Sequence, residues 1–563
     1  MLDNEKDIVD VKQYGAKGDG LTDDSHAIQK ALNTGNDILV SNGIFLIKSA
    51  IQTTKDNQKI TGNGLIKINN SSLIWSMIKL RNNGSVLNGP GIDNRNAQGA
   101  VHISGNNCTV QNCSFIESGY RGYHIFIGSD CKNSVIENNK FTGGNTNEPM
   151  VFISHAQDVK ILHNHFKDSG SWALHTDNVT NITISENVCE NALFDKEITA
   201  DANQKVFDFD TNNMFAFPNF GILVFSGTQV LKSGFTKTSR QGSIIITFEK
   251  GRRRNEIIRC LAFKAAENFN INSRTHNCHI LNNRLNNSGD SNITVASDYT
   301  GAKLDPRNTK RVDYPTDIFI HNNYLENAFG CNIAISQTNK VSIIRNTCIN
   351  AGYGRFSTFY NSGIAVPQSI ESIIEENSVS NTAGGIAENG ILALENSVKT
   401  KKFLRRNSIS NIKNKYYLGA ESDLKDFKSG IYIEGNYKPF KDYTLDQYKN
   451  ISSIKNNVIT IYNNDDGYLG FNFQNISVLR NSLVRFRFES STQGDNGQAL
   501  IQVLYKWANN YQAKSISIAG SSNKQYEIYI PFASPQDIIF RLIARKNNSI
   551  FNVRNLDISY LSL

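Results

Sequence analysis

The residues best suited to chemistry are two aspartates with an arginine between them. Asp177, Arg274 and Asp298 each lie three residues beyond the last apolar residue of a short strand-like segment. If the three residues lie on three successive strands about 4.8 Å apart, the two aspartates are two strands from each other. Their carboxyls would then lie about 10 Å apart, near the upper end of the separation in an inverting glycosidase. Arg274 would then hold a sugar carboxylate or lower the pKa of one aspartate. A structural salt-bridge ladder at the strand ends is the alternative.

A second pair of carboxyls, Glu395 and Glu434, follows directly after the apolar segments ILAL and GIYI. On successive strands these side chains would point outward about 5 Å apart. Like charges that close raise one pKa, which suits a proton donor. A solvated surface column and a contact with a neighbouring subunit are the alternatives. Both pairs are therefore candidates for catalytic carboxyls.

Histidines and aromatic residues add to the same candidate surface. His155 and His175 are expected to face one side, where a histidine can act as the base of a β-elimination beside a uronate carboxylate. We place His175 with the catalytic candidates and His155 with the substrate-binding ones. Tyr123, His124 and Trp172 offer flat surfaces to sugar rings, with core packing as the alternative for Trp172. Simple exposure is the alternative for the histidines.

A repeat must position these residues. Its pattern is an apolar residue, two variable residues, Asn, one variable residue and an apolar residue, as in IENNKF, ILHNHF and IHNNYL. The shared Asn falls at 139, 164, 187, 283, 323, 346, 377, 407 and 457, and a second short strand lies between most of these units. Steps near 25 residues predict a parallel β-solenoid, whose stacked asparagines bond along the axis. An apolar spacing of two, not 3.6, disfavours helical repeats.

The opening segment indicates how this solenoid begins. An open solenoid end exposes unpaired backbone and apolar core, and the segment DDSHAIQKALNTG predicts a short amphipathic helix that covers it. The motif YGAKGDGLTDDSHAIQKAL closely resembles the opening motif of the pectate-lyase-like right-handed β-helix superfamily. The resemblance implies an all-β chain folded as a right-handed parallel β-helix, with Asp23 and Asp24 as structural residues of the cap. It implies little about substrate.

Within that superfamily the chain looks most like bacteriophage tailspike depolymerases. This resemblance covers roughly residues 7–465 and rests on the opening motif, a start without a secretion signal and a β-rich C-terminal piece. It implies a homotrimer on the phage tail or baseplate, made in the host cytoplasm and acting at the bacterial surface. It also implies cleavage of a capsular or other surface polysaccharide without a cofactor.

Signatures of the pectin-acting members are missing. Only LHTDN at 174–178 approaches their Asn-Thr-Asp strand, and the sequence lacks Gly-His-Gly and Arg-Ile-Lys. The calcium-binding aspartate cluster of classical pectate lyases is not recognisable either. We therefore expect neither pectin hydrolysis nor a bound metal.

Interruptions of the repeat predict the domain organisation. Residues 1–40 are expected to form the entry strand and capping helix, 41–465 the β-helix, and 467–563 an antiparallel, jelly-roll-like β-sandwich for glycan binding or trimerisation. An insertion at about 192–266 is interpreted as β-hairpins beside the Asp–Arg–Asp column. Its Arg252 and Arg254 suit an anionic glycan, and a subunit contact is the alternative.

Composition narrows the partners. The net charge of +8 permits an acidic partner, but basic runs are absent except at residues 252–254, which disfavours nucleic acid. The apolar runs are too short for membrane insertion. The eight cysteines are scattered without a metal-type pair, which predicts buried free thiols.

The sequence therefore predicts a trimeric β-helix that binds and cuts an acidic bacterial surface polysaccharide, by hydrolysis in preference to elimination. Two alternatives remain. One is a cellular polysaccharide lyase or epimerase of the same fold, and the other is an adhesin that binds glycans without cutting them. An enzyme needs a carboxylate with a perturbed pKa in a groove, whereas an adhesin needs only aromatic side chains and hydrogen bonders.

Overall fold

The computed structural model describes residues 7–562, apart from 69–73, 96, 119–121, 129, 145–147, 211–221, 228, 232, 241–242, 264–265, 297–313, 337, 354–360, 368, 383–386, 396–400, 421–429, 434–437, 440–443, 448–451, 456–457, 464–467, 479–481, 494–497, 508–509, 520–523, 533–535 and 546–548. The chain forms two compact units. The first comprises Met1–Thr300, Arg311–Ile364 and Asn377–Glu388, and the second comprises Gly301–Lys310, Ala365–Glu376 and Asn389–Leu563.

The first unit opens with the predicted capping helix, α1 (Ser25–Asn33). Its apolar side buries Ile28 and Leu32, as the helical spacing of these residues requires. Asp24 accepts hydrogen bonds from the backbone N–H groups of Lys17 and Gly18, at 2.6 and 3.0 Å. This aspartate therefore braces the loop before the helix, which confirms its structural role.

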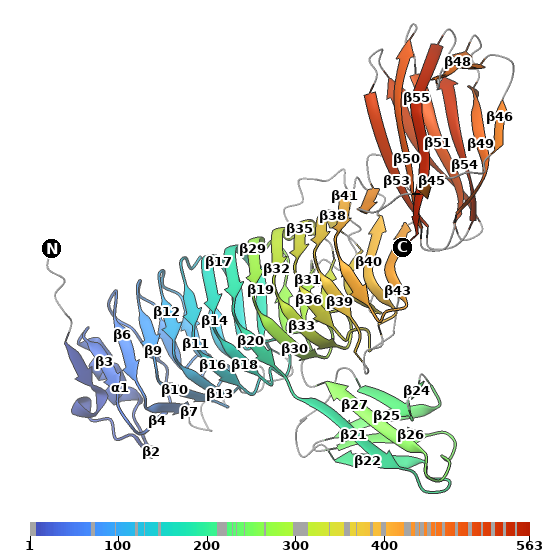
Figure 1. The fold of residues 1–563 in the computed structure, drawn as a ribbon. Coiled ribbons are helices and arrows are strands. Elements are labelled where there is room, and N and C mark those ends of the chain that lie inside the picture. The colour runs from blue at the N-terminus through green and yellow to red at the C-terminus, as the bar shows by residue number, and fades with distance from the viewer. Residues whose placement is uncertain are drawn as a thin grey trace. The chain divides into compact units, whose positions relative to one another are not determined.

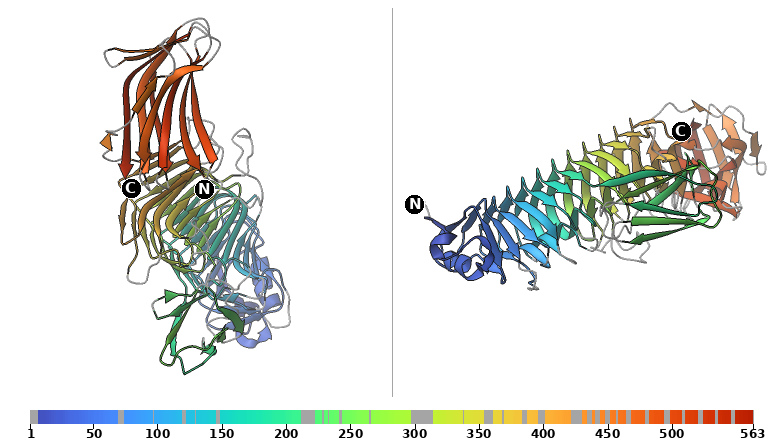
Figure 2. Two further views of the ribbon diagram at one scale, coloured as in Figure 1. Left: turned by 90° about the vertical axis from the view of Figure 1, so that its right-hand side faces the viewer. Right: turned by 90° about the horizontal axis from the view of Figure 1, so that it is seen from below.

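Three strands build each full rung of the first unit, a right-handed parallel β-helix (Figures 1 and 2). Face 1 contains β5 (Ile51–Gln52), β8 (Ile78–Leu80), β11 (Gly99–Ile103), β14 (Tyr123–Ile127), the starts of β17 (Val151–Leu162) and β19 (Leu174–Ser185), β28 (Phe269–Ile271), β31 (Ile293–Val295), β34 (Ile333–Ile335) and β37 (Ser362–Val366). Face 2 contains β1 (Ile8–Asp10), β3 (Asp37–Val40), β6 (Lys59–Gly62), β9 (Val86–Asn88), β12 (Thr109–Gln111), β15 (Val135–Glu137), the ends of β17 and β19, β29 (His276–Leu281), β32 (Thr316–His321) and β35 (Thr338–Ile344). Face 3 contains β2 (Asp19–Asp23), β4 (Ile44–Ile47), β7 (Leu65–Ile68), β10 (Gly91–Asn94), β13 (Ser114–Ser118), β16 (Lys140–Thr142), β18 (His165–Lys167), β20 (Val188–Glu190), β30 (Arg284–Ser288), β33 (Tyr324–Ala328), β36 (Thr347–Ile349) and β39 (Ser378–Ser380).

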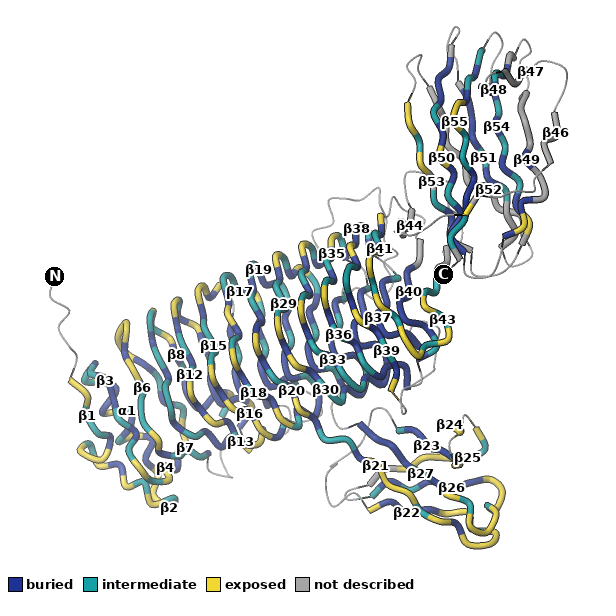
Figure 3. Tube along the Cα trace, viewed as in Figure 1, coloured by how far each residue is buried: buried dark blue, intermediate teal, exposed yellow. Residues whose placement is uncertain are grey.

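Side chains alternate between the core and the surface along these strands (Figure 3). On β17, for example, Val151 and Ile153 are fully buried while Phe152 between them is partly exposed. Equivalent residues of successive rungs then stack along the axis. This alternation places one outward residue in the middle of each face 1 strand, and those residues form the surface considered below.

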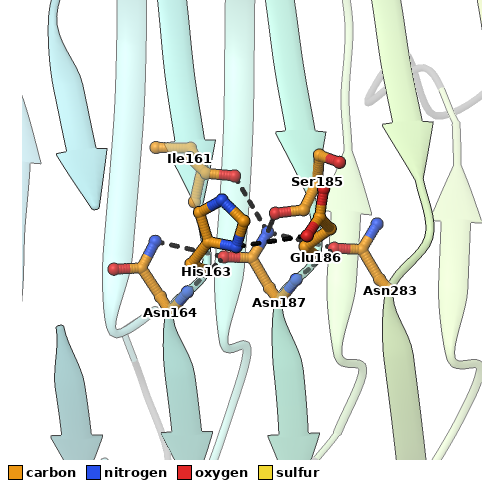
Figure 4. A network of polar contacts seen from close by, with 7 residues as sticks. All are labelled: Ile161, His163, Asn164, Ser185, Glu186, Asn187 and Asn283. Atoms are coloured by element: carbon orange, nitrogen blue, oxygen red, sulfur yellow. Dashed lines mark hydrogen bonds and ion pairs between the residues drawn. The ribbon is translucent and has the colours of Figure 1, made fainter. Parts of the chain in front are cut away.

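A ladder of asparagines runs along the inside of one corner, through residues 139, 164, 187, 283, 323, 346 and 377. Figure 4 shows Asn164, Asn187 and Asn283 of this ladder. At a typical step, the backbone N and Nδ2 of Asn164 both donate to Oδ1 of Asn187, at 2.9 and 3.1 Å. Asn187 makes the same pair of bonds to Asn283, so these two residues lie on adjacent rungs although 96 positions apart. The predicted asparagine column is confirmed from residue 139 to 377, and Asn457 lies outside the described residues. An insertion between Asn187 and Asn283 loops out of the β-helix.

The looped-out insertion contains two antiparallel sheets. One has the order β21 (Leu193–Thr199), β27 (Ile257–Phe263), β23 (Ile222–Ser226), β24 (Gln229–Val230), and the other β22 (Val206–Asp210), β26 (Ser243–Phe248), β25 (Phe235–Arg240). Phe207 and Ile246 belong to their shared core. Phe263 packs against Phe329 and Tyr353 of the β-helix, with ring centroids 5.8 and 5.7 Å apart.

The second unit contains rung strands β38 (Ser369–Glu375), β40 (Asn389–Glu395), β41 (Lys401–Arg405), β42 (Ser408–Ser410), β43 (Asn414–Ala420) and β44 (Gly430–Ile433). It also contains two antiparallel sheets. One has the order β47 (Ser452–Lys455), β48 (Val458–Asn463), β55 (Ser549–Ser562), β50 (Ser482–Gln493), β53 (Lys524–Phe532), with β45 (Lys438–Pro439) paired to β55. The other has the order β46 (Thr444–Gln447), β49 (Tyr468–Val478), β54 (Gln536–Arg545), β51 (Gln498–Trp507), β52 (Asn510–Ala519). Phe486 and Phe540 stack across their common core, with centroids 4.7 Å apart.

All eight cysteines are buried and none forms a disulfide, as predicted. Burial raises the pKa of thiols such as Cys189, which keeps them protonated and unreactive. No helix among the described residues has the length and apolar content to cross a membrane.

Candidate active site

The register of face 1 differs from the one predicted. Ile271 pairs with Thr176 and not with Leu174, so the predicted alignment was displaced by two residues. Thr176 points into the core and is fully buried although it is polar. Because it interrupts the apolar pattern, the sequence indicated Leu174 as the last inward residue of this strand, two residues too early. Because of this displacement, the residues that were expected at equivalent positions after these two strands do not lie in one column.

The predicted alignment of Asp177 with Arg274 in one column is therefore wrong. Asp177 is the pairing partner of Ser154 on the rung before it. Arg274 is exposed at the corner after β28, with a left-handed φ of 60°. Asp298 lies outside the described residues. Asp177 and Arg274 therefore do not occupy equivalent positions, and the catalytic roles expected of the trio stay predictions.

The predicted pairing of Glu395 with Glu434 is also wrong. Glu395 pairs with Ala420 on β43, the next strand of its own column. The strand before Glu434 belongs to a different column, because Ile433 pairs with Leu404 on β41. Glu434 itself lies outside the described residues. Two strands with similar apolar patterns were thus assigned to one face although they belong to two.

Tyr123 and His124 do not offer flat surfaces to a ligand, because both are buried. His124 is fully buried, its Nδ1 lies 3.0 Å from Oδ1 of Asn94, and burial lowers its pKa to about 3. Tyr123 is 7% exposed, and burial together with the charge of Glu148 raises its pKa. Both residues contribute to packing, and their predicted binding role is wrong.

The remaining predicted binding residues are dispersed. His155 is exposed at the corner within β17, and its Nδ1 lies 2.8 Å from the hydroxyl of Ser154. In the insertion, Arg252 forms an ion pair with Glu256, which engages its charge internally. Arg254 is exposed. His155 thus lies next to the pairing partner of Asp177, whereas both arginines belong to the insertion.

A column of outward aromatic rings runs along face 1. We call five residues the aromatic column: Trp75, His102, Phe126, Phe152 and His175. The last four pair with one another in turn on successive strands, and Trp75 contacts His102. Successive centroids lie 4.8, 5.2, 5.4 and 5.2 Å apart. Trp75 is 47% exposed, which is unusual for so large an apolar side chain. The predicted candidate His175 is the last ring of this column.

A carboxyl group lies directly over the continuation of the aromatic column. The two outward positions after His175 are Asn270 and Thr294. Oε2 of Glu267 accepts hydrogen bonds from Nε1 of Trp172 at 2.6 Å and Nδ2 of Asn270 at 2.5 Å, and Oε1 accepts one from the Thr294 hydroxyl at 2.7 Å. Trp172 also contacts His175, with centroids 5.4 Å apart. Glu267 is thus fixed in orientation by three donors.

A second carboxyl, Asp290, interacts with Glu267, and we call these residues the carboxyl pair. Burial and the negative charge of Glu267 raise the pKa of Asp290 from 3.8 to about 7, against a smaller lowering by the Ser291 hydroxyl. The backbone of Asp290 is anchored on both sides, by Ala266 at 2.7 Å and by Gly330 at 2.6 Å. A carboxyl in this state carries a proton near neutral pH and can donate it.

The turns that hold the carboxyl pair are set by a second amide ladder. Asn191 donates to Asn268 at 2.6 Å, Asn268 to Asn292 at 2.7 Å, and Asn292 to Asn332 at 2.7 Å, all through Nδ2 and Oδ1. These asparagines are buried, so each bond forms in a low-dielectric environment where it constrains the backbone strongly. The ladder therefore fixes the turns just before β28 and β31, and these turns carry Glu267 and Asp290.

Sequence reasoning missed Glu267 and Asp290 because it searched the ends of strands. Both acids precede their strands, in the segments AENFNI and SGDSNITV. Glu267 lies two residues before Phe269, the first residue of β28, whereas Asp290 lies three residues before Ile293, the first residue of β31. Aligning the buried Asn268 and Asn292 would have revealed them, because each acid lies within two residues of that shared asparagine.

Comparison with known proteins places this fold among the right-handed parallel β-helices. Residues 8–214 match the family model described as rhamnogalacturonase A/epimerase, pectate lyase-like. The predicted resemblance to the pectate-lyase-like β-helix superfamily is confirmed. The A-module of the mannuronan C-5 epimerase AlgE4 from Azotobacter vinelandii has the same fold, with a TM-score of 0.50, 11% identity, and coverage of 73% of this chain and 99% of that module.

Two relatives match shorter segments. The pre-neck appendage protein of Bacillus phage phi29 is 45% identical over 56 residues, which is 10% of this chain and 6% of that protein. The plasmin and fibronectin-binding protein A of Streptococcus pneumoniae R6 is 26% identical over 178 residues, which is 25% of this chain and 24% of that protein. The chain thus covers less than a quarter of the length of either relative.

Proposed function

We propose that this protein is a polysaccharide depolymerase of the phage tailspike type, which hydrolyses a glycosidic bond held over Asn270 and Thr294. The observation that carries the proposal is the carboxyl pair, because a proton-bearing Asp290 beside an oriented Glu267 is what acid–base glycoside cleavage requires. The pair also lies at one end of an aromatic surface suited to sugar rings.

In this mechanism Asp290 donates its proton to the oxygen of the bond that breaks. The C–O bond to the anomeric carbon is cleaved, the leaving sugar departs as an alcohol, and a water oxygen adds to that carbon. Glu267 stabilises the positive charge that develops on the sugar and accepts the proton that the attacking water releases. Trp172, Asn270 and Thr294 hold Glu267 in place while this occurs.

The aromatic column defines a path for the substrate. Five rungs spaced about 4.8 Å apart give a path of about 20 Å, enough for roughly four sugar residues. Lys79 occupies the next outward position beyond His102 and provides a positive charge there. An acidic glycan lying parallel to the axis fits this arrangement, with Lys79 and the positive net charge as its electrostatic partners.

The phage assignment rests on the similarity to a phage pre-neck appendage protein and on the opening motif. We propose that the protein is part of a virion tail, acts at the bacterial surface and forms a homotrimer. The C-terminal sheets of the second unit would serve either glycan binding or trimerisation. Gel filtration with light scattering tests the trimer, since a monomer would contradict it.

The function is tested by incubating the protein with purified capsular polysaccharides from a panel of bacteria. New reducing ends measure cleavage, and ultraviolet absorbance of an unsaturated sugar distinguishes elimination from hydrolysis. We expect reducing ends without that absorbance, and loss of about 100-fold or more in rate for both Asp290→Asn and Glu267→Gln. Asp177→Asn is the matched control, because it removes a carboxyl from a neighbouring position of face 1.

The alternatives make different predictions in the same experiment. New absorbance would indicate a lyase and would favour His175 as the base. Binding to a capsule without any cleavage would indicate an adhesin, for which the aromatic column alone suffices. Equal loss of activity in Asp177→Asn and Asp290→Asn would contradict the assignment of the carboxyl pair.

A further inference from the structure

A groove on face 2 is separate from the carboxyl pair. Its volume is about 350 Å³. It is bordered by the ends of β17 and β19 and by β29, with these six residues among its lining: Asp158, Lys160, Asn181, Thr183, Asn277 and His279. The corner at Arg274 separates β28 on face 1 from β29 on face 2. The groove is therefore on another face of the β-helix than the one that carries Glu267.

One wall of the groove is an aromatic face. His279 stacks on Phe319 of the following rung, with centroids 4.5 Å apart and planes 8° apart. On the preceding rung its partner is Thr183, a much smaller side chain, so the second face of the imidazole is turned toward the groove. Asn277 holds the ring by a contact of 2.9 Å between Nε2 and Oδ1. Burial lowers the pKa of His279, so the ring is uncharged near neutral pH.

Polar groups line the corner beside this ring. Nδ2 of Asn181 donates to Oδ1 of Asp158 at 2.8 Å, and Nδ2 of Asn277 donates to Oδ1 of Asn181 at 2.9 Å. This chain of amides fixes the side chains in one orientation before any ligand binds, which reduces the entropy lost on binding. The charges of Lys160 and Asp158 offset each other, so the groove as a whole is close to neutral.

We propose that this groove is a second carbohydrate site, which binds one or two uncharged sugar residues by stacking on His279 and by hydrogen bonds to the amide chain. Its volume is at the lower end of the range for small-ligand sites and matches a ligand of that size. A flat ring flanked by fixed amides is the arrangement that sugar hydroxyl and acetamido groups require. Such a site anchors a glycan without cutting it, and so adds a function to the proposed hydrolysis on face 1.

The test is saturation-transfer NMR on the full chain with three probes: the methyl glycosides of glucose, N-acetylglucosamine and glucuronic acid. We expect transfer to at least one uncharged glycoside and weaker transfer to the glucuronide. Thr183→Trp fills the groove and His279→Ala removes the stacking face, and each should reduce the signal about fivefold or more. Trp172→Ala alters face 1 only and should leave the signal in place.

Several results would overturn the proposal. These are no transfer to either uncharged glycoside, a signal that persists in both Thr183→Trp and His279→Ala, or a signal lost in Trp172→Ala, which would move binding to face 1. A change of oligomeric state in Thr183→Trp would show that a second copy of the chain covers the groove. Melting temperatures close to that of the parent protein verify that each variant is folded.

Discussion

Replacing Asp290 with asparagine should stabilise the protein above neutral pH while it removes activity. The pKa of Asp290 is raised in the folded state, so the folded protein holds this proton over a pH range where the unfolded chain has released it. The free energy of unfolding therefore falls as the pH rises from about 4 to about 7, and the penalty is fully present above that window. Asparagine has nearly the same shape and carries no charge, so it abolishes the penalty.

The magnitude follows from the shift. A change from 3.8 to about 7 corresponds to a ceiling of about 4 kcal/mol at high pH. Relaxation around the two carboxyls reduces this, and we expect about 2 kcal/mol at about pH 8 and close to zero at about pH 4. For a cooperative unit of several hundred residues, that is an increase in Tm of about 3 °C.

The assay is thermal unfolding of the parent protein and Asp290→Asn at both pH values. Glu267→Gln provides the control, because removing the charge of Glu267 relieves part of the same penalty. In the Glu267→Gln background, Asp290→Asn should therefore raise Tm by less than it does alone. An asparagine variant that is less stable than the parent at high pH, or equally shifted at both pH values, would refute the reasoning.

Three further predictions concern other parts of the first unit. Asn187→Ala leaves the backbone N–H and Nδ2 of Asn164 without their acceptor, so unfolding in urea should show a loss of about 3–5 kcal/mol; a loss below about 1 kcal/mol would contradict the role of the ladder. In the insertion, burial raises the pKa of Glu256, but hydrogen bonds from Arg252 and a serine outweigh it and lower the pKa to about 2. That carboxylate contributes stability above about pH 4.5 that is lost as the pH falls toward 2, so Glu256→Gln should increase proteolysis of the insertion at neutral pH but not in acid. Trp172→Phe keeps the ring but loses the bond to Glu267, and should lower kcat about tenfold with little change in KM, whereas a change confined to KM would make it only a binding residue.

The fold was predictable because its signals are local and repeated. Each asparagine of the ladder occurs in the same short apolar context, and stacking such units leaves few other ways to satisfy buried amides. The opening motif likewise combines a helix pattern with Asp24, whose carboxylate accepts two backbone N–H bonds. At these positions the local sequence pattern and the hydrogen bonds that the fold needs point to the same structure, so the fold could be predicted from the sequence.

The site was not predictable in the same way, because it depends on register. A buried Thr176 shifted the alignment of one strand by two residues, and that error moved every side chain after it. Glu267 and Asp290 occur in turns without a motif, and their interaction arises only when rungs separated by turns of different length are stacked. The raised pKa of Asp290 is a property of that stacking and has no local signal in the sequence.

The most direct test of the central claim is the pH dependence of the cleavage rate on a polysaccharide that the protein degrades. If Asp290 is the proton donor, kcat/KM must fall as the pH rises through about 7, because only the protonated carboxyl can act. Asp290→Asn should lose about 100-fold or more of the rate at every pH at which the parent is active, while it still binds the polymer. A rate that continues to rise above about pH 8, or an asparagine variant with parental activity, would contradict the account.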